Sequence, residues 1–320
     1  VLAVFESAKL PEAREVPLLD VRRGARRLGG HAQTVRDLLD DDPERCGWIE
    51  ARSDRYGVHA ELAHAPIEVG PVLRRILWDK LPATTAASAT LTVAGRFKHW
   101  QVRVGQPEAE TDVLPSPFDH AAQAMLALPR DLPLPDAPDF LSATASAVVD
   151  AVRASRGGAF VLCTSHEAVE QYARAVRAAL PSARLLVQDR SGRAGLVEQF
   201  RETRDAVLIG TDSFWEGVDV RGDALRLVII PRLPFRVPTD PLTEARYERA
   251  KARGLDPFQA FSLPEAIIKL KQGYGRLIRS RSDRGVVLML DRRLHDRPYG
   301  RIMLASLPPA RRVVGPWRRV

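Results

Sequence analysis

The chain has 320 residues, of which 45% are hydrophobic and 28% are charged, so it is long enough for about two domains with cores of their own. No apolar run reaches the roughly 18 residues of a membrane span, and two cysteines cannot build a disulfide framework, so we expect a cytoplasmic protein. The net charge of +8 favours a polyanionic partner such as nucleic acid. Only 6 of the 48 basic residues are lysine, and codon composition would explain this arginine bias equally well.

The first half of the chain has the less regular pattern. Residues 22–39 predict a helix, and residues 48–51 and 58–63 predict strands. A proline-dense stretch over residues 107–138 then separates the two halves. We expect this stretch to be a connector with little regular structure, apart from a short helix around residues 119–126.

From Ala159 onward, short apolar runs alternate with amphipathic stretches. The amphipathic stretches at residues 167–180 and 194–201 predict helices, and residues 242–281 are mostly helix-permissive. Strands alternating with helices predict an α/β fold with a parallel sheet covered on both faces. The predicted buried strands are residues 159–163, 184–187, 206–209, 225–230 and 285–290.

The loop Gly210–Asp219 follows one predicted strand and carries many polar side chains that could bind a ligand. It holds two glycines, two hydroxyl side chains and three carboxylates, and a loop at the carboxyl end of a parallel strand is where open α/β sheets bind ligands. Phe214 and Trp215 are expected to anchor this loop to the core. An acidic turn that only satisfies its own backbone is the alternative.

Residues 264–281 predict an amphipathic helix with a basic face. At about 100° per residue, Lys269, Gln272, Arg276 and Arg279 fall on the side opposite the apolar residues. Two glycines, Gly273 and Gly275, cost such a helix roughly 1 kcal/mol each relative to alanine, which predicts that a backbone or ligand approaches closely there. A solvated basic face is the alternative.

These segments carry a family resemblance. The loop Gly210–Asp219 with the following residues 225–235, and the run Gln272–Arg279, resemble motifs V and VI of the DinG/XPD branch of superfamily 2 helicases. Ser88–Leu91 and Val161–Ser165 resemble motifs III and IV, in the family's order. The resemblance implies a RecA-like parallel sheet lobe with helices on both faces, preceded by a partial first lobe and an arch-like helical remnant.

Under this resemblance, residues 1–56 are the remnant of an arch-like insertion, residues 57–105 the end of a first RecA-like lobe, and residues 106–320 the second lobe. The chain lacks motifs I and II, because none of its lysines follows a glycine and no Asp-Glu pair occurs. We therefore expect a fragment whose missing first lobe holds most of the ATP and Mg²⁺. An iron-sulfur cluster is possible in the missing upstream region, with none in this chain.

The resemblance also assigns roles to single residues. Arg279 would be the arginine finger on the transferring phosphoryl group, with Arg276 and Gln272 beside it. Nucleotide contacts are implied for Glu216, Gly217, Asp219 and Gly275; contacts to DNA phosphates for Thr164, Ser165 and Thr211; and coupling of the lobes for Ser88 and Thr90. No residue is expected to bind a metal.

The resulting expectation is the C-terminal motor lobe of an ATP-dependent DNA helicase with a role in DNA repair. Its partners would be single-stranded or forked DNA and the missing N-terminal lobe, with no membrane, and the fragment alone would be inactive. One alternative is a stand-alone nucleic-acid-binding accessory protein or split-motor subunit. Another is an α/β enzyme that uses Glu216 and Asp219 as acid and base, which is disfavoured because no nucleophile or metal set accompanies them.

Overall fold

The computed structural model describes residues 15–40, 42–54, 57–188, 195–211, 214–215, 220, 222–236 and 240–320. The chain forms two compact units. The hairpin unit comprises Val1–Pro82, Arg103–Gly105 and Val237–Pro257, and the sheet unit comprises Ala83–Val102, Gln106–Arg236 and Phe258–Val320. Among the described helices, none combines the length and apolar character that a membrane span requires.

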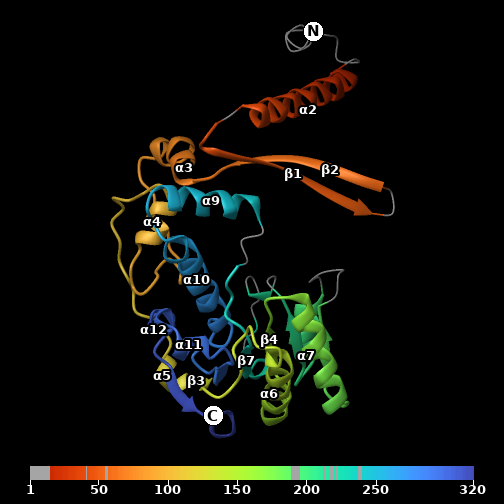
Figure 1. The fold of residues 1–320 in the computed structure, drawn as a ribbon, viewed down its shortest axis with the longest axis vertical. Helices are drawn as coiled ribbons and strands as arrows, with labels where there is room; N and C mark the ends of the chain where they lie inside the picture. The colour runs from red at the N-terminus through yellow and green to blue at the C-terminus, as the bar shows by residue number, and fades with distance from the viewer. Residues whose placement is uncertain are drawn as a thin grey trace. The chain divides into compact units, whose positions relative to one another are not determined.

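The sheet unit is built on a seven-stranded sheet with the order β5-β6-β4-β7-β8-β3-β9, and every neighbouring pair is parallel. Strands β3 and β9, far apart in sequence, lie side by side at one end (Figure 1). The strands are β3 (Ala124–Pro129), β4 (Ala159–Leu162), β5 (Leu185–Val187), β6 (Val207–Gly210), β7 (Leu227–Ile230), β8 (Gly285–Met289) and β9 (Arg311–Gly315).

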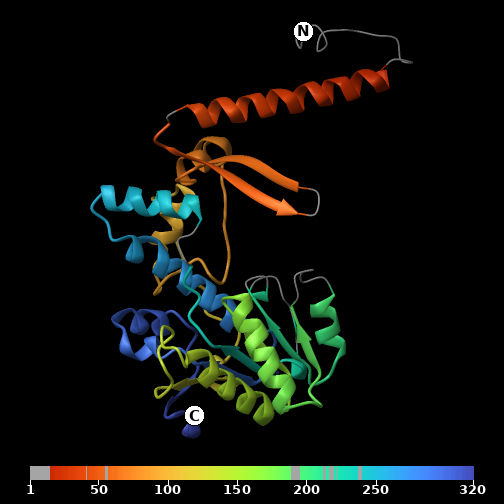
Figure 2. The same ribbon diagram turned by 45° about the vertical axis from the view of Figure 1, so that its right-hand side comes forward.

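Helices cover both faces of this sheet, which confirms the predicted fold class. Helices α6 (Phe140–Ser155) and α7 (His166–Ala179) pack together over one face, in yellow-green and green in Figure 2. Helices α8 (Leu196–Glu202), α10 (Leu263–Tyr274) and α12 (Pro298–Ala305) contribute residues to the core on the other face. Helix α11 (Arg293–Asp296) and the short η6 (Trp317–Arg319) complete the C-terminal part.

Alternating strand residues explain why the sheet has two separate cores. In β4, Phe160 and Leu162 belong to the cluster on the α10 face, whereas Ala159 and Val161 belong to the cluster on the α6 and α7 face. All four side chains are at most 1% exposed. Because successive strand side chains point to opposite faces, an all-apolar run is what a strand covered by helices on both sides requires.

The five strands predicted from apolar runs are confirmed as β4 to β8, with boundaries shifted by one or two residues. Strands β3 and β9 were not predicted, and neither was helix α6. The expected connector is therefore only partly irregular: the predicted helix near residue 119 is the single turn α5 (His120–Gln123), and it leads directly into β3.

The hairpin unit has little buried surface. Helix α2 (Glu15–Leu39) contacts an antiparallel hairpin of β1 (Arg45–Asp54) and β2 (Gly57–Pro66), and helix α9 (Pro241–Ala252) contacts β1 (Figure 1). The predicted helix and both predicted strands of this region are confirmed and are longer than predicted. Short helices α3 (Gly70–Ile76) and η2 (Trp78–Lys80) follow. Helix α4 (Lys98–Val104) lies mostly in the sheet unit, with its last residues in the hairpin unit.

The compact units divide the chain at other places than the predicted domains. The predicted boundary at residue 56 falls between β1 and β2, which pair as one antiparallel hairpin from Arg45 with Pro66 to Asp54 with Gly57. The hairpin unit also includes Val237–Pro257, from within the predicted second lobe. The assignment of residues 57–105 to a first motor lobe stays a prediction.

Candidate active site

Trp215 joins three of the predicted motifs within the sheet unit. Its side chain is fully buried, and its indole Nε1 donates a hydrogen bond of 3.2 Å to the carbonyl oxygen of Cys163, directly after β4. Its own carbonyl oxygen accepts a hydrogen bond of 3.0 Å from Nε of Arg276. The motif V loop is therefore fixed between motifs IV and VI, and the prediction that Phe214 and Trp215 anchor it is confirmed, since Phe214 is only 1% exposed.

The close approach predicted at Gly273 is made by the same tryptophan. A Cβ atom at residue 273 would lie 2.9 Å from two carbons of the Trp215 ring, closer than real Cβ contacts come. The ammonium of Lys269, one turn earlier on α10, lies 5.6 Å from the centre of the Trp215 ring. A cation at this distance from an indole face is attracted to it. Helix α10 thus packs on the motif V loop through a glycine and a lysine.

The predicted helix over residues 264–281 ends early. Helix α10 stops at Tyr274, with Gly275 as its C-cap, so Arg276 and Arg279 do not share a helical face with Lys269 and Gln272. The Nε of Arg276 donates to the carbonyl oxygens of Gln272, at 3.2 Å, and of Trp215. This guanidinium therefore holds the end of α10 against the motif V loop, and its side chain is buried.

Residues 275–284, here called the motif VI loop, lead from α10 to β8 and contain Arg279. Arg279 is half-buried, and its backbone amide donates to the Asp283 carboxylate at 2.7 Å. Asp283 precedes β8 by two residues, so the Arg279 backbone is held near the amino ends of β8 and its neighbour β3. Asp283 was not among the predicted site residues, although a carboxylate four residues after the motif arginine is a local signal that could have been used.

The hydroxyl residues of motif IV lie at the carboxyl end of β4. Ser165 caps α7, because its Oγ accepts a hydrogen bond of 3.2 Å from the amide of Ala168. Thr164 and Ser165 line a pocket of about 230 Å³ together with Arg232, which follows β7. The carboxylate of Glu167 also lines this pocket, and the hydroxyls, the guanidinium of Arg232 and the amino end of a helix are the groups that would hold an anion there.

Part of the lining of this pocket consists of two buried side chains that solvent hardly reaches. Tyr172 and Cys163 also line it, and both are 1% exposed. Burial raises the pKa of the Tyr172 phenol and of the Cys163 thiol, so both stay protonated at neutral pH. The Tyr172 hydroxyl lies 3.0 Å from the hydroxyl of Thr144 on α6. These residues shape the pocket and support its rim.

Thr211 occupies the corresponding place after β6 but is mostly buried. Its amide and its hydroxyl both donate to the side-chain oxygen of Gln188, at 2.6 and 3.0 Å. Gln188, directly after β5, therefore fixes the start of the motif V loop and was missed by the sequence analysis. The prediction that Thr211 contacts a DNA phosphate stays a prediction.

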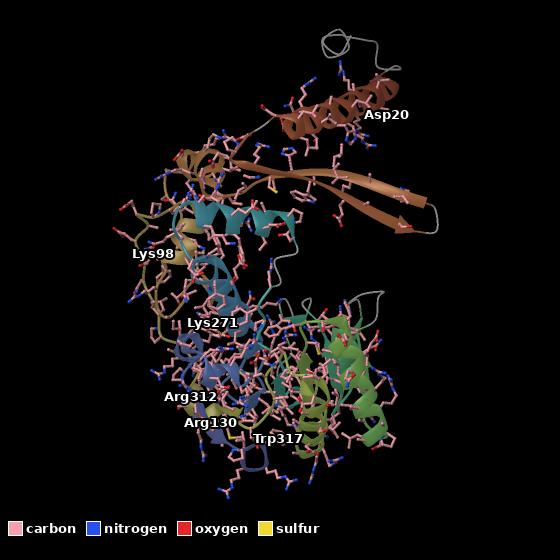
Figure 3. All side chains as sticks on the ribbon, in the orientation of Figure 1. Asp20, Lys98, Arg130, Lys271, Arg312 and Trp317 are labelled. Atoms are coloured by element: carbon pink, nitrogen blue, oxygen red, sulfur yellow. The ribbon has the colours of Figure 1, made fainter. Side chains whose placement is uncertain are left out.

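Of predicted motif III, Ser88 is exposed, and Thr90 lies in a turn and is half-buried, with their hydroxyls 3.3 Å apart. Two residues further on, Thr92 accepts two hydrogen bonds from the ammonium of Lys271, one to its carbonyl oxygen at 3.0 Å and one to its hydroxyl at 3.2 Å. Lys271 lies on α10 (Figure 3), and burial lowers its pKa. The segment that follows predicted motif III is therefore hydrogen-bonded to helix α10, which precedes the motif VI loop.

Three predicted nucleotide contacts, Glu216, Gly217 and Asp219, lie outside the described residues. Gly275 lies at the end of α10, where its amide donates to the carbonyl oxygen of Lys271 at 2.9 Å. The structure thus brings Gln272, Gly275 and Arg276 together at one helix end. It places Thr164 and Ser165 at the carboxyl end of β4.

The described residues do not form a site for a metal ion. No three His, Cys, Asp or Glu side chains gather anywhere in the described part of the chain. Both cysteines are free, with Cys46 in the hairpin unit and Cys163 in the sheet unit.

The family of this chain follows from a match to the helicase C-terminal domain, whose family model covers residues 148–310. This range is slightly more than half of the chain and contains α7, the motif V loop and the motif VI loop. The chain belongs to this family, and its motifs are those of a DinG/XPD-like superfamily 2 helicase.

Individual relatives carry more specific names. The chain is 43% identical over 272 residues to the ATP-dependent DNA helicase YoaA of Escherichia coli. This alignment covers 85% of this chain and 42% of YoaA. The chain is 36% identical over 290 residues to the ATP-dependent helicase DinG of Mycobacterium tuberculosis, covering 89% and 42%. It is 33% identical over 299 residues to the 3'-5' exonuclease DinG of Bacillus subtilis, covering 90% and 32%. The chain thus spans less than half of each relative.

Proposed function

We propose that this chain is the C-terminal motor region of an ATP-dependent DNA helicase that couples ATP hydrolysis to movement along single-stranded DNA. The observation that carries the proposal is the connection of three motifs through Trp215, which bonds to Cys163 on one side and to Arg276 on the other. A motor needs such a connection, because the nucleotide state must change the grip on DNA. Alone, without a lobe that holds the phosphates, the chain would not hydrolyse ATP.

In this proposal Arg279 neutralises charge that develops on the transferring phosphoryl group. Electrostatic stabilisation by an arginine is the main contribution a second lobe makes in such motors. Gln272, at the end of α10, closes on the nucleotide or the attacking water, and Gly275 lets the backbone approach the nucleotide. Arg276 acts differently, because its Nε donates to two backbone carbonyl oxygens. It would hold Trp215 of the motif V loop at a fixed position on the end of α10, so that the two move together.

DNA would be gripped at the carboxyl ends of the strands. Thr164, Ser165 and Arg232 line one pocket, and a phosphate of the DNA backbone fits its hydroxyls and positive charge. Such contacts position a strand without reading its sequence, as a translocating motor requires. Glu216, Gly217 and Asp219 follow Trp215 in sequence and would pass the nucleotide state to this pocket. Ser88 and Thr90 would couple the two lobes.

ATP and Mg²⁺ would be held mainly by a first lobe. Mg²⁺ supplies charge neutralisation between the β- and γ-phosphates in such reactions. The residues of this chain contribute the finger and the closing glutamine. Forked or single-stranded DNA and the first lobe are the proposed partners.

The finger assignment is tested by Arg279→Ala in the full-length protein that contains this chain. We expect kcat of DNA-stimulated ATP hydrolysis to fall about a thousand-fold or more, because only the transition state loses its partner. The dissociation constant for single-stranded DNA, measured by fluorescence anisotropy, should change less than about two-fold. Arg281→Ala is the matched control, since Arg281 is exposed and lies two residues further along the same loop.

Two results would contradict the proposal. An unchanged kcat in Arg279→Ala would remove the finger, and absence of any DNA-stimulated ATP hydrolysis in the wild-type full-length protein would remove the motor function itself. Hydrolysis of ATP by the 320-residue chain alone would contradict the assignment of the phosphate site to another lobe.

A further inference from the structure

The motif VI loop is organised around one buried carboxylate. Asp283 is only 4% exposed, and its two oxygens accept four hydrogen bonds. One oxygen, Oδ2, accepts from the amides of Arg279 at 2.7 Å and Ser280 at 2.8 Å. The other, Oδ1, accepts from the Ser280 hydroxyl at 2.5 Å and from the amide of Gly222 at 3.1 Å. Gly222 belongs to η4 (Gly222–Ala224), which precedes β7.

A second buried side chain holds the same loop from outside. The amide nitrogen of Gln123 donates to the carbonyl oxygens of Ser280, at 2.9 Å, and of Asp283, at 3.0 Å. Gln123 is the last residue of α5 and is 4% exposed. The turn between Arg279 and β8 is thus fixed by a carboxylate inside it and by an amide from the element before β3. Neither side chain has a role in the predicted motifs.

We infer that Asp283 is a positioning residue that sets the backbone of Arg279, and thereby the direction in which its guanidinium reaches the nucleotide. This inference rests on the proposed function of Arg279. A carboxylate has about four lone-pair positions, and here backbone amides and a hydroxyl occupy all four. Asp283 therefore acts on the main chain of the finger and does not serve as an ion-pair partner for its guanidinium.

The link to Gly222 extends this role to motif V. Gly222 lies three residues beyond the motif V loop, and its amide shares Oδ1 of Asp283 with the Ser280 hydroxyl. The same carboxylate therefore binds the backbone of the finger residue Arg279 and the backbone of Gly222, after motif V. A displacement of about 1 Å in a reacting group is enough to lower a rate about a hundred-fold, so a fixed loop matters to the chemistry.

Asp283 is charged at neutral pH. Burial alone would raise its pKa, but the hydrogen bonds from Ser280, Arg279 and Gly222 outweigh burial, and the net pKa lies below the ordinary value for aspartate. The four donors therefore face an anion under working conditions. An asparagine at this position would keep one acceptor oxygen and turn an NH₂ group toward two of the donors.

A double-mutant cycle in the full-length protein separates positioning from a general structural role. We expect Asp283→Ala to lower kcat of DNA-stimulated ATP hydrolysis about ten- to hundred-fold, with KM for ATP and the DNA dissociation constant changed less than about two-fold. In the Arg279→Ala background, where residual hydrolysis is measured in single turnover with enzyme in excess, Asp283→Ala should cause no further loss. Asp150→Ala is the control, since Asp150 is an exposed carboxylate paired with Arg153 on α6.

Two further variants keep the test decisive if Asp283→Ala does not fold. Asp283→Asn keeps the shape of the side chain. Ser280→Ala removes the hydroxyl bond to Asp283, together with the contacts of the same hydroxyl to Ser282, and should lower kcat about five-fold. The effects of Asp283→Asn and of losing the Ser280 bond to Asp283 should also vanish in the Arg279→Ala background. Hydrogen exchange provides a readout that does not depend on hydrolysis: the amides of Arg279 and Ser280 should exchange at least about ten-fold faster in Asp283→Asn and unchanged in Asp150→Ala.

The outcomes distinguish this inference from the proposed function. If Arg279→Ala abolishes turnover but Asp283→Ala and Ser280→Ala leave kcat unchanged, or reduce it equally in both backgrounds, Asp283 does not position the finger. If Arg279→Ala has no effect on turnover, the proposed function of Arg279 fails first. Unchanged exchange of the Arg279 amide in Asp283→Asn would overturn the inference whatever the hydrolysis data show.

Discussion

The two compact units of this chain are held together in different ways. The sheet unit has two apolar clusters, one on each face of a parallel sheet whose central strands are completely buried. The hairpin unit leaves most of its large apolar side chains exposed, among them Leu28, Leu39, Ile49 and Val58. Its described contacts with α9 are largely polar. A parallel sheet must be covered on both faces, whereas a two-stranded hairpin can keep one face in water, so the same chain contains both solutions.

Arginines take the place of a core in the hairpin unit. Arg246 and Arg249 lie one turn apart on α9, and Arg253, four residues further on, is its C-cap residue. The Arg246 Nε donates to the carbonyl oxygen of Ile67 at 3.0 Å. Arg249 pairs with Glu44 at 2.6 Å, and Arg253 pairs with Glu68 at 2.5 Å. Ion pairs near the surface contribute little each, so this unit should be far less sensitive to single substitutions than the sheet unit.

The largest difference in stability loss between the units is expected when the buried Trp215 and the half-buried Trp48 are each replaced by alanine. Trp215→Ala should lower the free energy of unfolding of the sheet unit by about 3–5 kcal/mol, because a fully buried indole leaves a cavity and its hydrogen bond to Cys163 is lost. Trp48→Ala, the matched change in β1, should cost the hairpin unit about 1–2 kcal/mol. Urea unfolding followed by far-ultraviolet circular dichroism, with hydrogen exchange to assign each transition, measures both. Equal losses would contradict the contrast between the units.

The fold could be predicted where burial leaves a sequence signature. Strands β4, β6 and β7 are short, almost wholly apolar runs in which every residue is buried. Strand β3 was missed because Ala124–Pro129 stands among prolines and contains no β-branched residue, and β9 was missed because Arg311 and Arg312 begin an exposed edge strand. Their pairing is decided by tertiary contacts that local patterns do not record.

The candidate site was predictable as motifs but not as geometry. The amphipathic pattern continues to Arg279, so periodicity alone extends α10 beyond its observed end at Tyr274. At this end the helical bond from the Arg276 amide to the Gln272 carbonyl is not made: the amide donates to the Gly273 carbonyl oxygen at 3.2 Å, and the Arg276 side chain donates to Gln272 instead. Gln123 was missed because its bonds go to backbone carbonyl oxygens, which a pattern of residue types does not record. For Asp283 the spacing from Arg279 was the one available signal, but it does not show which backbone amides the carboxylate binds.

The two cysteines give an intermediate test of the comparison. Cys163 in the sheet unit is 1% exposed and burial raises its thiol pKa, so iodoacetamide should reach it only after the unit opens. Cys46 in the hairpin unit is half-buried, and burial, followed by the charges of Asp240, Glu248 and Glu244, raises its pKa. Because the thiolate is the reactive form, labelling of Cys46 should accelerate as pH rises from about 8 toward 9.5.

We expect the labelling rate of Cys46 to exceed that of Cys163 at least about a hundred-fold in the native 320-residue chain. Mass spectrometry of the labelled peptides gives both rates in one sample, and Cys46→Ser confirms the peptide assignment. Comparable rates at pH 8 would mean that the sheet unit opens as readily as the hairpin unit, and the contrast drawn from burial would fail.

The smallest effect is expected from the arginines of α9. Arg249→Ala removes the ion pair with Glu44 and a hydrogen bond to the carbonyl oxygen of Pro43, and should cost the hairpin unit only about 0.5–1 kcal/mol. The side chain of Glu44 is 65% exposed, so solvent screens the pair and its contribution should shrink further in 1 M salt. Arg153→Ala, which breaks an exposed pair with Asp150 on α6, is the control in the sheet unit. A loss above about 2 kcal/mol for Arg249→Ala that does not change with salt would mean that this arginine stabilises the hairpin unit as strongly as a buried core residue. The contrast between the two units would then be wrong.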